Sequence, residues 1–374
     1  MRDQIEELRP QIMEMFRHLH STPEISWEEF ETTKYLKHFL EKQGLQVRTF
    51  DSSTGLVADL GRGKPVVALR ADIDALWQEV DGKLQANHSC GHDAHMAMAA
   101  GVVLVLKDYL SKNEGTVRFL FQPAEEKGTG ALHFINEKVI DDVDYLYGVH
   151  LRPVQEIPDG TASPAIQHGA ARFISGKISG EDTHGARPHL GVNAIEVGAA
   201  LVNLIKGIHA DPMVPHSIKM TRFHGGEKNA NIIPGSASFS LDLRAQTNEV
   251  MEELTRKTYE IVNHLAKLHE VEIELEVAAD VAAAKIHPEA QQIMAISIEE
   301  TLGKFCLKEP VVTTGGDDFH FYTIKRPHVK ATMLGLGCGL TPGLHHPKMT
   351  FNHDAILVGV EILSRTIMRT LRGG

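Results

Sequence analysis

Five short segments of the sequence carry side chains that bind divalent metal ions. They are Asp72 with Asp74, the stretch HSCGHDAH at 88–95 with Cys90 and His92, the pair Glu125 and Glu126, His150, and the pair His345 and His346. Four of them follow a short apolar run of the type that forms a buried strand, at 66–71, 116–122, 143–149 and 331–336. Because ligands bind at the carboxyl ends of strands in open α/β sheets, we expect these segments to converge.

The adjacent glutamates suggest which reaction such a site would perform. A Glu-Glu pair usually lies on a solvated surface, but Glu125 and Glu126 follow Pro123 at the end of an apolar strand. Their repulsion in a poorly solvated loop is costly unless a cation offsets it. One carboxylate can bind the metal, while the other takes the proton of a metal-bound water whose pKa is lowered to about 7. The same acid can pass that proton to a leaving amine, which is the chemistry of amide hydrolysis.

Cys90 and His92 lie two residues apart at the start of an expected helix. A thiolate is stabilised at a helix N-terminus and beside a metal, so Cys90 suits a ligand. The competing interpretations are a buried structural thiol and a redox cysteine, although a redox pair has no neighbouring second cysteine. The remaining histidines of these motifs are assigned structural roles, namely His20, His95, His320 and His353.

The elements that must position these groups follow from the hydrophobic pattern. Apolar residues recur at helical spacing from 2 to 44, with a break at Pro23. Short apolar runs then alternate with helical segments such as 94–109 and 288–302, which predicts an α/β fold with a mostly parallel sheet flanked by helices. Between them lies a β-α-β-β-α-β order typical of a ferredoxin-like domain, with strands at 172–179, 217–224, 236–244 and 271–277 and helices at 193–210 and 250–268. We therefore expect a discontinuous metal-binding catalytic domain, 1–170 and 283–374, interrupted by an insert at 171–282.

Composition excludes several classes of protein. At 374 residues with 42% hydrophobic residues the chain can bury the cores of two or more domains, so it is neither a small disulfide module nor disordered. The net charge of −11 and the lack of any cluster of five Lys or Arg residues argue against a nucleic-acid partner. Three widely spaced cysteines suit a reducing compartment, and the charged amphipathic start argues against a signal peptide or membrane span. We expect a soluble, cytoplasmic protein.

Eight motifs read together resemble a known family. They are RADIDAL, HSCGHDAH, FQPAEE, YGVHLRP, THGARPH, GGEKNANIIPG, GGDDF and LHHP, and the match runs from about His18 to the C-terminus. In this order they resemble the bacterial and plant amidohydrolase branch of the aminoacylase/carboxypeptidase-like dinuclear metallopeptidases. That branch includes hippurate hydrolases, indole-acetyl-amino-acid hydrolases and N-acetyl-diaminopimelate deacetylases.

The resemblance implies a role for each matching residue. Two divalent ions would be ligated by Cys90, His92, Glu126, His150 and His345. Glu125 matches the catalytic base and Asp72 the carboxylate that supports the metal site. The inserted ferredoxin-like domain would act as lid and dimer contact, with His184 stabilising the tetrahedral oxyanion, often from the partner subunit, and Asn231 and Arg244 holding the substrate carboxylate.

Three departures from the family pattern bear on specificity. Trp77 stands where the family often has proline after the leucine, Glu181 and Asp182 replace glycines before His184, and Gly316-Asp317 replaces a serine-glutamate pair. The expected metal site is unaffected, but the acyl-group preference does not follow from the family.

These observations lead to one main hypothesis and two alternatives. We expect a metal-dependent amidohydrolase acting on N-acyl amino acids, a linear amide, with Mn, Zn, Co or Ni as cofactor. A dipeptidase or carboxypeptidase would use the same site, and Glu181, Asp182 and Asp317 are candidates to recognise a free amino terminus. A non-catalytic metal-binding scaffold is the remote alternative, since a structural metal site needs no adjacent base. A homodimer is expected because strand 236–244 or its neighbours would otherwise leave an exposed sheet edge.

Overall fold

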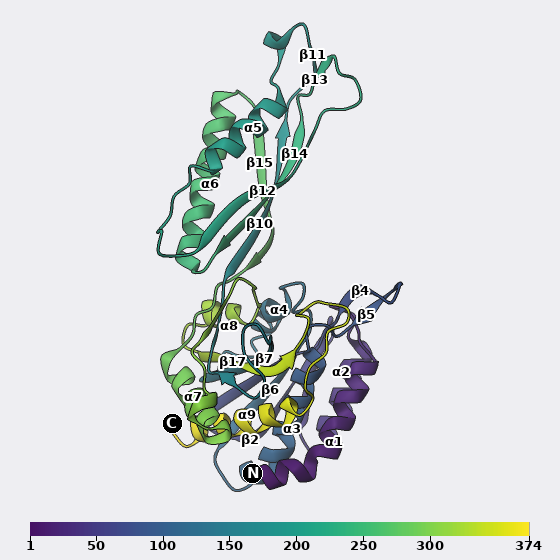
Figure 1. Cartoon of the computed structure of the whole chain (residues 1–374), viewed down its shortest axis with the longest axis vertical. Helices are drawn as coiled ribbons and strands as arrows, with labels where there is room; N and C mark the ends of the chain where they lie inside the picture. Colours follow the sequence, from purple (N-terminus) through teal and green to yellow (C-terminus); the bar gives the residue numbers. More distant parts are fainter. Residues whose placement is uncertain (374) are drawn as a thin grey trace. The chain divides into compact units, whose positions relative to one another are not determined.

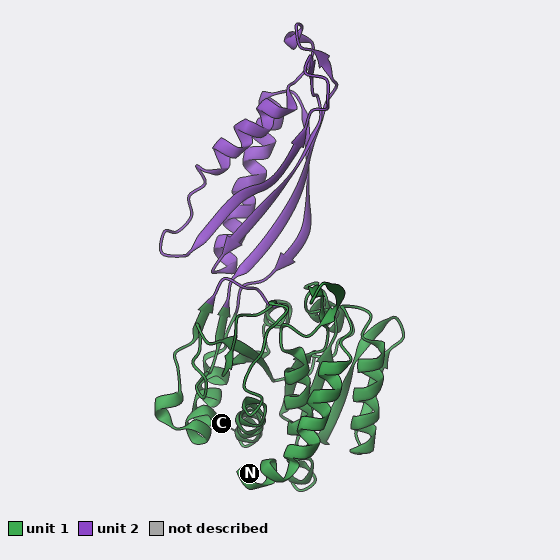
Figure 2. Ribbon diagram, turned by 45° about the vertical axis from the view of Figure 1, so that its right-hand side comes forward, with its two compact units in different colours: residues 1–167, 285–312, 318–374 green, residues 168–284, 313–317 purple. Residues whose placement is uncertain are grey.

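The structure, a computed structural model, describes residues 1–373 and divides into two compact units (Figure 2). Unit 1 comprises Met1–Gln167, Lys285–Val312 and Asp318 to the end of the described chain, and unit 2 comprises His168–Ala284 and Thr313–Asp317. The expected insert of 171–282 lacked residues 313–317. This short segment belongs with unit 2 because the amide of Gly169 donates to the carbonyl oxygens of Thr313 and Gly315, at 3.1 Å each.

Unit 1 is built on a sheet with the order β1-β2-β6-β3-β7-β17-β8 (Figure 1). Its strands are β1 (Gln46–Phe50), β2 (Ser53–Arg62), β3 (Val66–Asp72), β6 (Gly115–Gln122), β7 (Tyr145–Pro153), β8 (Ala162–Ser163) and β17 (Lys330–Leu340). The four central strands, β6, β3, β7 and β17, are parallel as expected, whereas β1, β2 and β8 make the margins antiparallel. The central strands are buried on both faces, which explains their continuous apolar sequences.

Helices cover both faces of this sheet. They are α1 (Arg2–Ser21), α2 (Phe30–Lys42), α3 (His92–Leu110), α4 (Gly130–Asn136), α7 (Pro288–Leu302), α8 (His320–Lys325) and α9 (Ala355–Leu371), with a 3-10 turn at Lys304–Cys306. On one face α3 packs on β2, β3 and β6, and it is itself covered by α1 and α9, so it is buried all round. On the other face α4 contacts β6 and α8. None of the helices between residues 1 and 373 is long and apolar enough to cross a bilayer.

Two small strand pairs complete unit 1 and its junction with unit 2. The hairpin of β4 (Leu76–Val80) and β5 (Lys83–Asn87) follows β3 directly. The pair β9 (Ile166–His168) and β16 (Val311–Thr313) lies where the chain passes between the units.

Unit 2 has the β-α-β-β-α-β order expected from the sequence. Its main elements are β10 (Ala170–Ser179), α5 (Ala194–Ile205), β12 (His216–Gly225), β14 (Ala237–Ala245), α6 (Asn248–Leu268) and β15 (Glu272–Val281), with β11 (Thr183–His184), β13 (Ile232–Ile233) and a 3-10 turn at Pro188–Leu190 in the loops. The sheet order is β12-β14-β10-β15. The strand expected at 236–244 is therefore interior, between β12 and β10, and the edges of the sheet are β12 and β15.

One strand runs further than its apolar run suggested. We expected the strand at 143–149 to end before His150, but β7 continues to Pro153. The reason is its partner: β17 also continues, and Gly335 pairs with His150 and Leu336 with Leu151. His150 therefore lies within a strand, where the parallel ladder fixes its backbone.

Arg70 ties the strand ends of unit 1 together from within the core. Its side chain is 1% exposed and donates to Asp72 at 2.7 Å, to Gln122 at 3.1 Å and to Asp318, just before α8, at 2.8 Å. The Asp318 carboxylate also accepts the amide of Ala131 at the start of α4. Burial by itself would raise the pKa of Asp72, but Arg70, His92 and His95 outweigh it and hold that pKa well below its ordinary value.

We predict that Arg70→Met lowers the free energy of unfolding by about 3–5 kcal/mol at neutral pH, because it leaves buried carboxylates without their cation. Urea unfolding followed by circular dichroism measures the loss. The matched control is Arg118→Met, which removes ion pairs to the largely exposed Asp59 and Asp142 and should cost about 1 kcal/mol or less. Equal losses in the two variants would contradict a central role for the Arg70 network.

Candidate metal centre

The ends of β3, β6 and β7 bring the expected metal-binding segments together in unit 1. β3 ends at Asp72, which pairs in register with Gln122 at the end of β6, and Glu125 and Glu126 follow in the next turn. His150 lies on β7, the other neighbour of β3. The convergence predicted from the positions of the strand ends is thus what the structure contains.

Cys90 and His92 reach this cluster from the start of α3. Gly91 takes the N-cap position with φ +89°, a left-handed conformation, and a Cβ atom there would lie 2.9 Å from Leu151. Glycine therefore allows the turn to pack directly against β7. Both side chains are buried, and the Cys90 Sγ lies 3.5 Å from the His150 Nε2.

The two glutamates and His345 complete the group. The Nε2 of His92 lies 4.0 Å from the Glu125 Oε2 and 3.9 Å from the Glu126 Oε1. The Glu126 Oε1 in turn lies 3.4 Å from the Nε2 of His345. His345 adopts φ +63°, and its amide donates to the Ser89 carbonyl at 2.8 Å, which holds its loop beside Cys90.

A surrounding layer of polar contacts orients these side chains. His92 Nδ1 lies 2.8 Å from the Asp74 carbonyl oxygen, so its Nε2 faces the glutamates. His95, expected to be structural, lies 2.7 Å from Asp72 through Nδ1, while its Nε2 accepts the Leu151 amide. His95 thereby links Asp72 to β7, and the signal for it was its three-residue spacing from His92, which places both on one helix face.

The arrangement fits divalent cations. Several overlapping groups have ligand atoms within 4.8 Å of one another, among them Cys90 with His92 and His150, Cys90 with Glu126 and His345, and His92 with Glu125 and Glu126. The His92 Nε2 and the Glu126 Oε1 are buried without a hydrogen-bond partner, which is costly unless an ion occupies the space between them. Thiolate, imidazole and carboxylate together suit a transition metal.

Burial controls the protonation of the two deepest ligands. Burial, and then the charge of Glu126, raise the pKa of the Cys90 thiol well above its ordinary value. Burial lowers the pKa of His150 far below its ordinary value, so its imidazole is in the neutral form that binds metals. A cation would offset the cost of the Cys90 thiolate, because metal ligands must be deprotonated.

The candidate residues of the insert lie at two ends of unit 2. His184 pairs with Ile232 across β11 and β13, and the amide of Gly185 donates to the Asn231 carbonyl, so His184 and Asn231 are neighbours in the loops beyond Ser179 and Ala237. Arg244 lies at the opposite end of β14, near Ala170 where the chain enters the unit. There it donates to Asp242 and stacks on Phe173.

The residues that depart from the family pattern lie in three parts of the structure. Trp77 is 60% exposed on β4, on the face of the hairpin opposite Gln78, whose amide donates to the His345 carbonyl at 2.8 Å. Asp182 accepts the Gly235 amide at 2.9 Å, so its carboxylate fixes the loop beside His184. Asp317 lies in the short segment that returns to unit 2.

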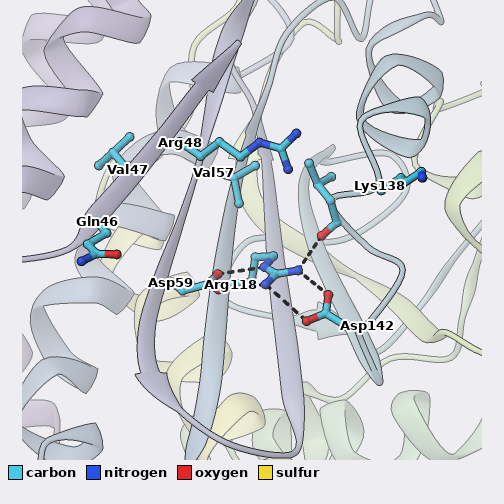
Figure 3. Close-up of a pocket in the computed structure, with 9 residues that line it drawn as sticks. Gln46, Val47, Arg48, Val57, Asp59, Arg118, Lys138 and Asp142 are labelled. Atoms are coloured by element: carbon cyan, nitrogen blue, oxygen red, sulfur yellow. Dashed lines mark hydrogen bonds and ion pairs between the residues drawn. The ribbon is translucent and has the colours of Figure 1, made fainter.

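A separate hollow of about 440 Å³ lies over β1, β2 and β6 (Figure 3). Arg118 lies within it and is the strongest candidate there to bind an anion. Its nitrogens, however, already donate to Asp59, to Asp142 and to the Val139 carbonyl. Arg118 is therefore already paired within the protein and does not present an unpaired charge to this hollow.

Comparison with known proteins agrees with this geometry. A family model described as "Peptidase family M20/M25/M40" matches residues 68–369. The chain is 30% identical to the N-acetyl-L-cysteine deacetylase of Bacillus subtilis over 383 residues, 97% of this chain and 89% of that protein. It is also 30% identical to the thermostable carboxypeptidase 1 of Saccharolobus solfataricus over 384 residues, 96% and 95% of the two chains.

A solved structure supports the fold. The Bacillus subtilis YXEP protein, described as a dinuclear metal binding peptidase from the M20 family, superposes with a TM-score of 0.83 and 23% sequence identity. The superposition covers 98% of this chain and 99% of that one. The α/β fold of this chain is therefore shared with that protein.

We predict that metal-free protein gains thermal stability when Mn²⁺ or Zn²⁺ is added, because the ion binds the folded state only. His92→Asn should weaken metal affinity by more than about 100-fold, since loss of even an outer-shell partner costs 10- to 100-fold. Thermal shift and elemental analysis of the bound metal measure the effect. His189→Asn, at an exposed position of unit 2, is the control, and an unchanged metal content in His92→Asn would rule out this cluster as the metal site.

Proposed function

The chain belongs to peptidase family M20/M25/M40, and on that premise we propose that it is a metal-dependent amidohydrolase that cleaves the amide bond of N-acyl amino acids. The observation that carries the proposal is the pair Glu125 and Glu126 beside His92 in a buried cluster. One glutamate is suited to hold metal, and its neighbour is suited to proton transfer.

We assign the metal ligands to the five residues expected from the sequence: Cys90, His92, Glu126, His150 and His345. Asp72 would support the site, because its carboxylate lies 3.4 Å from the Nε2 of His92 and 2.7 Å from the Nδ1 of His95. Two divalent ions bound there would supply Lewis acidity and a water of lowered pKa. Mn, Zn, Co and Ni all suit this ligand set.

Glu125 would act as general base and then as general acid. Its carboxylate would take a proton from the water that attacks the acyl carbonyl and return it to the leaving nitrogen. The amino acid then leaves as a neutral amine rather than as an unstable anion. His184 would stabilise the oxyanion, and Arg244 and Asn231 would hold the substrate carboxylate.

The distance between Arg244 and the pair His184 and Asn231 within unit 2 indicates that these residues would serve different substrate molecules. Between Ala237 and Arg244 β14 spans seven residues, or about 23 Å, and His184 and Asn231 lie beyond the Ala237 end. An N-acyl amino acid is much shorter than this. One substrate therefore cannot touch Arg244 together with His184 and Asn231 of the same subunit, which supports a second subunit as the source of one group.

The surface of unit 2 offers a place for that second subunit. β12 is an edge strand, and beside it a groove of about 370 Å³ between β12 and α5 is lined by Val202, Ile205, Ile218, Met220 and Phe223, among others. Free edges and apolar grooves are stabilised by pairing with a second copy. We propose a homodimer formed through this edge.

A peptidase is the second candidate function. The chain is similar to a protein named as a carboxypeptidase, and a peptide bond is an amide that the same residues could cleave. The retained Glu125 argues against a non-catalytic scaffold. For its location we propose the cytoplasm, because Cys90, Cys306 and Cys338 are all free thiols, and we propose neither a nucleic-acid nor a membrane partner.

Glu125→Gln should lower kcat by about 10² to 10⁴ while leaving bound metal unchanged, because it removes the base and little else. The measurement is amine release from N-acetyl, N-benzoyl and indole-acetyl amino acids and from simple dipeptides, with Mn²⁺ or Zn²⁺ added. Glu299→Gln, at an exposed position of α7, is the control. Full activity in Glu125→Gln would refute the assigned mechanism, and turnover of dipeptides alone would favour the peptidase.

A mixing experiment tests the shared site. His184→Ala and Glu125→Gln should each be inactive alone, but co-refolded together they should recover about a quarter of wild-type activity, because about half of the dimers are mixed and each mixed dimer has one complete site. Co-refolding of Glu125→Gln with the double variant His184→Ala/Glu125→Gln controls for non-specific rescue. If His184 served its own subunit, the mixture would stay inactive.

A further inference from the structure

The loop between α1 and α2 places one buried carboxylate beside the catalytic segment without contributing a metal ligand. Glu29 is 0% exposed and occupies the N-cap position of α2. Its side chain makes no capping bond to the helix there. A buried carboxylate at an N-cap would ordinarily serve the free amides of the first turn, so its use elsewhere needs an explanation.

The carboxylate of Glu29 is directed at the segment that carries the glutamate pair. Its Oε1 accepts the backbone amide of Ala124 at 2.9 Å, and its Oε2 accepts the Thr54 hydroxyl at 2.5 Å. Burial raises the pKa of Glu29 to about 7, and the nearby Asp74 adds to the effect. A neutral side chain of the same shape should therefore be tolerated at this position.

Ala124 is held in an unusual conformation by these contacts. It is buried and has φ +51°, in the left-handed region that alanine rarely adopts. Its carbonyl oxygen accepts the amides of Thr129 and Gly130, while its amide is bound by Glu29. The backbone immediately before Glu125 is thus fixed from both sides, as residues in sparsely populated conformations require.

A second carboxylate holds the other side of Glu125. The Asp74 Oδ2 accepts the backbone amide of Glu126 at 3.0 Å and the Ser26 hydroxyl at 2.6 Å. The amides of Ala124 and Glu126, which flank Glu125, are therefore each bound by a buried carboxylate. Ser26 and Glu29 come from the same loop, so one short segment acts on both sides of the base.

We propose that Glu29 is a positioning residue for the reaction: its carboxylate fixes the left-handed backbone of Ala124 and thereby aims the Glu125 side chain at the attacking water. This inference rests on the proposed function, because it assigns Glu29 a role through Glu125. Displacing a catalytic base by about 1 Å lowers the rate about 10²-fold. Fixing the backbone beside Glu125 should therefore affect turnover rather than substrate binding.

The test compares Glu29→Ala with Glu29→Gln in metal-loaded protein. Glu29→Ala should lower kcat about 10- to 100-fold with KM within about twofold, because the base is misplaced but the binding groups remain. Glu29→Gln should restore most of the rate, since its amide oxygen can still accept the Ala124 amide. Metal content should be unchanged in both variants.

Glu361→Ala is the matched control. Glu361 is also a buried carboxylate of unit 1, but on α9, where it pairs with Arg2 and Arg365. This variant should lose thermal stability while keeping its kcat. A Glu29→Ala variant that behaves like Glu361→Ala, less stable but equally fast, would overturn the proposal, as would loss of bound metal in Glu29→Ala.

Amide hydrogen exchange separates this inference from the proposed function. Exchange at Ala124 should accelerate in Glu29→Ala and stay slow in Glu29→Gln, whatever the substrate proves to be. An unchanged exchange rate at Ala124 in Glu29→Ala would refute the proposal that the Glu29 carboxylate fixes this amide. If exchange at Ala124 accelerates in Glu29→Ala but the wild-type protein turns over no amide, the contact between Glu29 and Ala124 stands and the proposed function is refuted.

Discussion

The concentration of buried charge at the ends of β3 and β6 is the constraint on which the rest of unit 1 depends. Asp72, Asp74 and Glu126 lie within a few residues of those strand ends, and burying carboxylates is unfavourable unless cations and hydrogen bonds compensate. Arg70 supplies the cation on the side of α8. On the side of α3 the carboxylates face imidazoles and a thiol, with the His92 Nε2 and the Glu126 Oε1 unsatisfied. Arg70 compensates the buried carboxylates on one side, and a divalent cation would compensate them on the other. Metal binding would therefore also stabilise the fold.

The same constraint explains why the local backbone is so closely specified. Gly91 allows α3 to begin against β7, His345 takes a left-handed conformation beside Cys90, and Ala124 takes one before the glutamate pair. The conformations of His345 and Ala124 are unfavourable for an isolated chain, and each is held by a hydrogen bond from a different segment. The site is therefore pre-arranged by segments far apart in sequence, which is what catalysis by oriented groups demands.

Much of this arrangement could be predicted from the sequence because it depends on local signals. Apolar runs followed by ligand-type residues predicted the converging loops, and the alternation of strands and helices predicted both the α/β unit and the order of elements in unit 2. The rest depends on contacts between distant segments. The extension of β7 past His150 comes from pairing with β17. The mixed sequences of β1 and β2 form strands because β2 pairs with β6 and β1 with β2. The contact of His95 with Asp72 could not be predicted, because the two residues are 23 positions apart in the sequence.

The choice between an acyl group and an aminoacyl group depends on where acidic side chains can meet the substrate amine. Asp182 is one of the candidates to recognise the free amino terminus of a dipeptide, and its carboxylate accepts the Gly235 amide. This bond occupies one acceptor position of the carboxylate and fixes its orientation toward the backbone of its own loop. Asp242 is likewise engaged, with Arg244, whose guanidinium suits the carboxylate end of a substrate. Asp182 and Asp242 thus bind the protein's own backbone and arginine, which favours a substrate whose amine is masked by an acyl group over one whose amine these two residues would recognise.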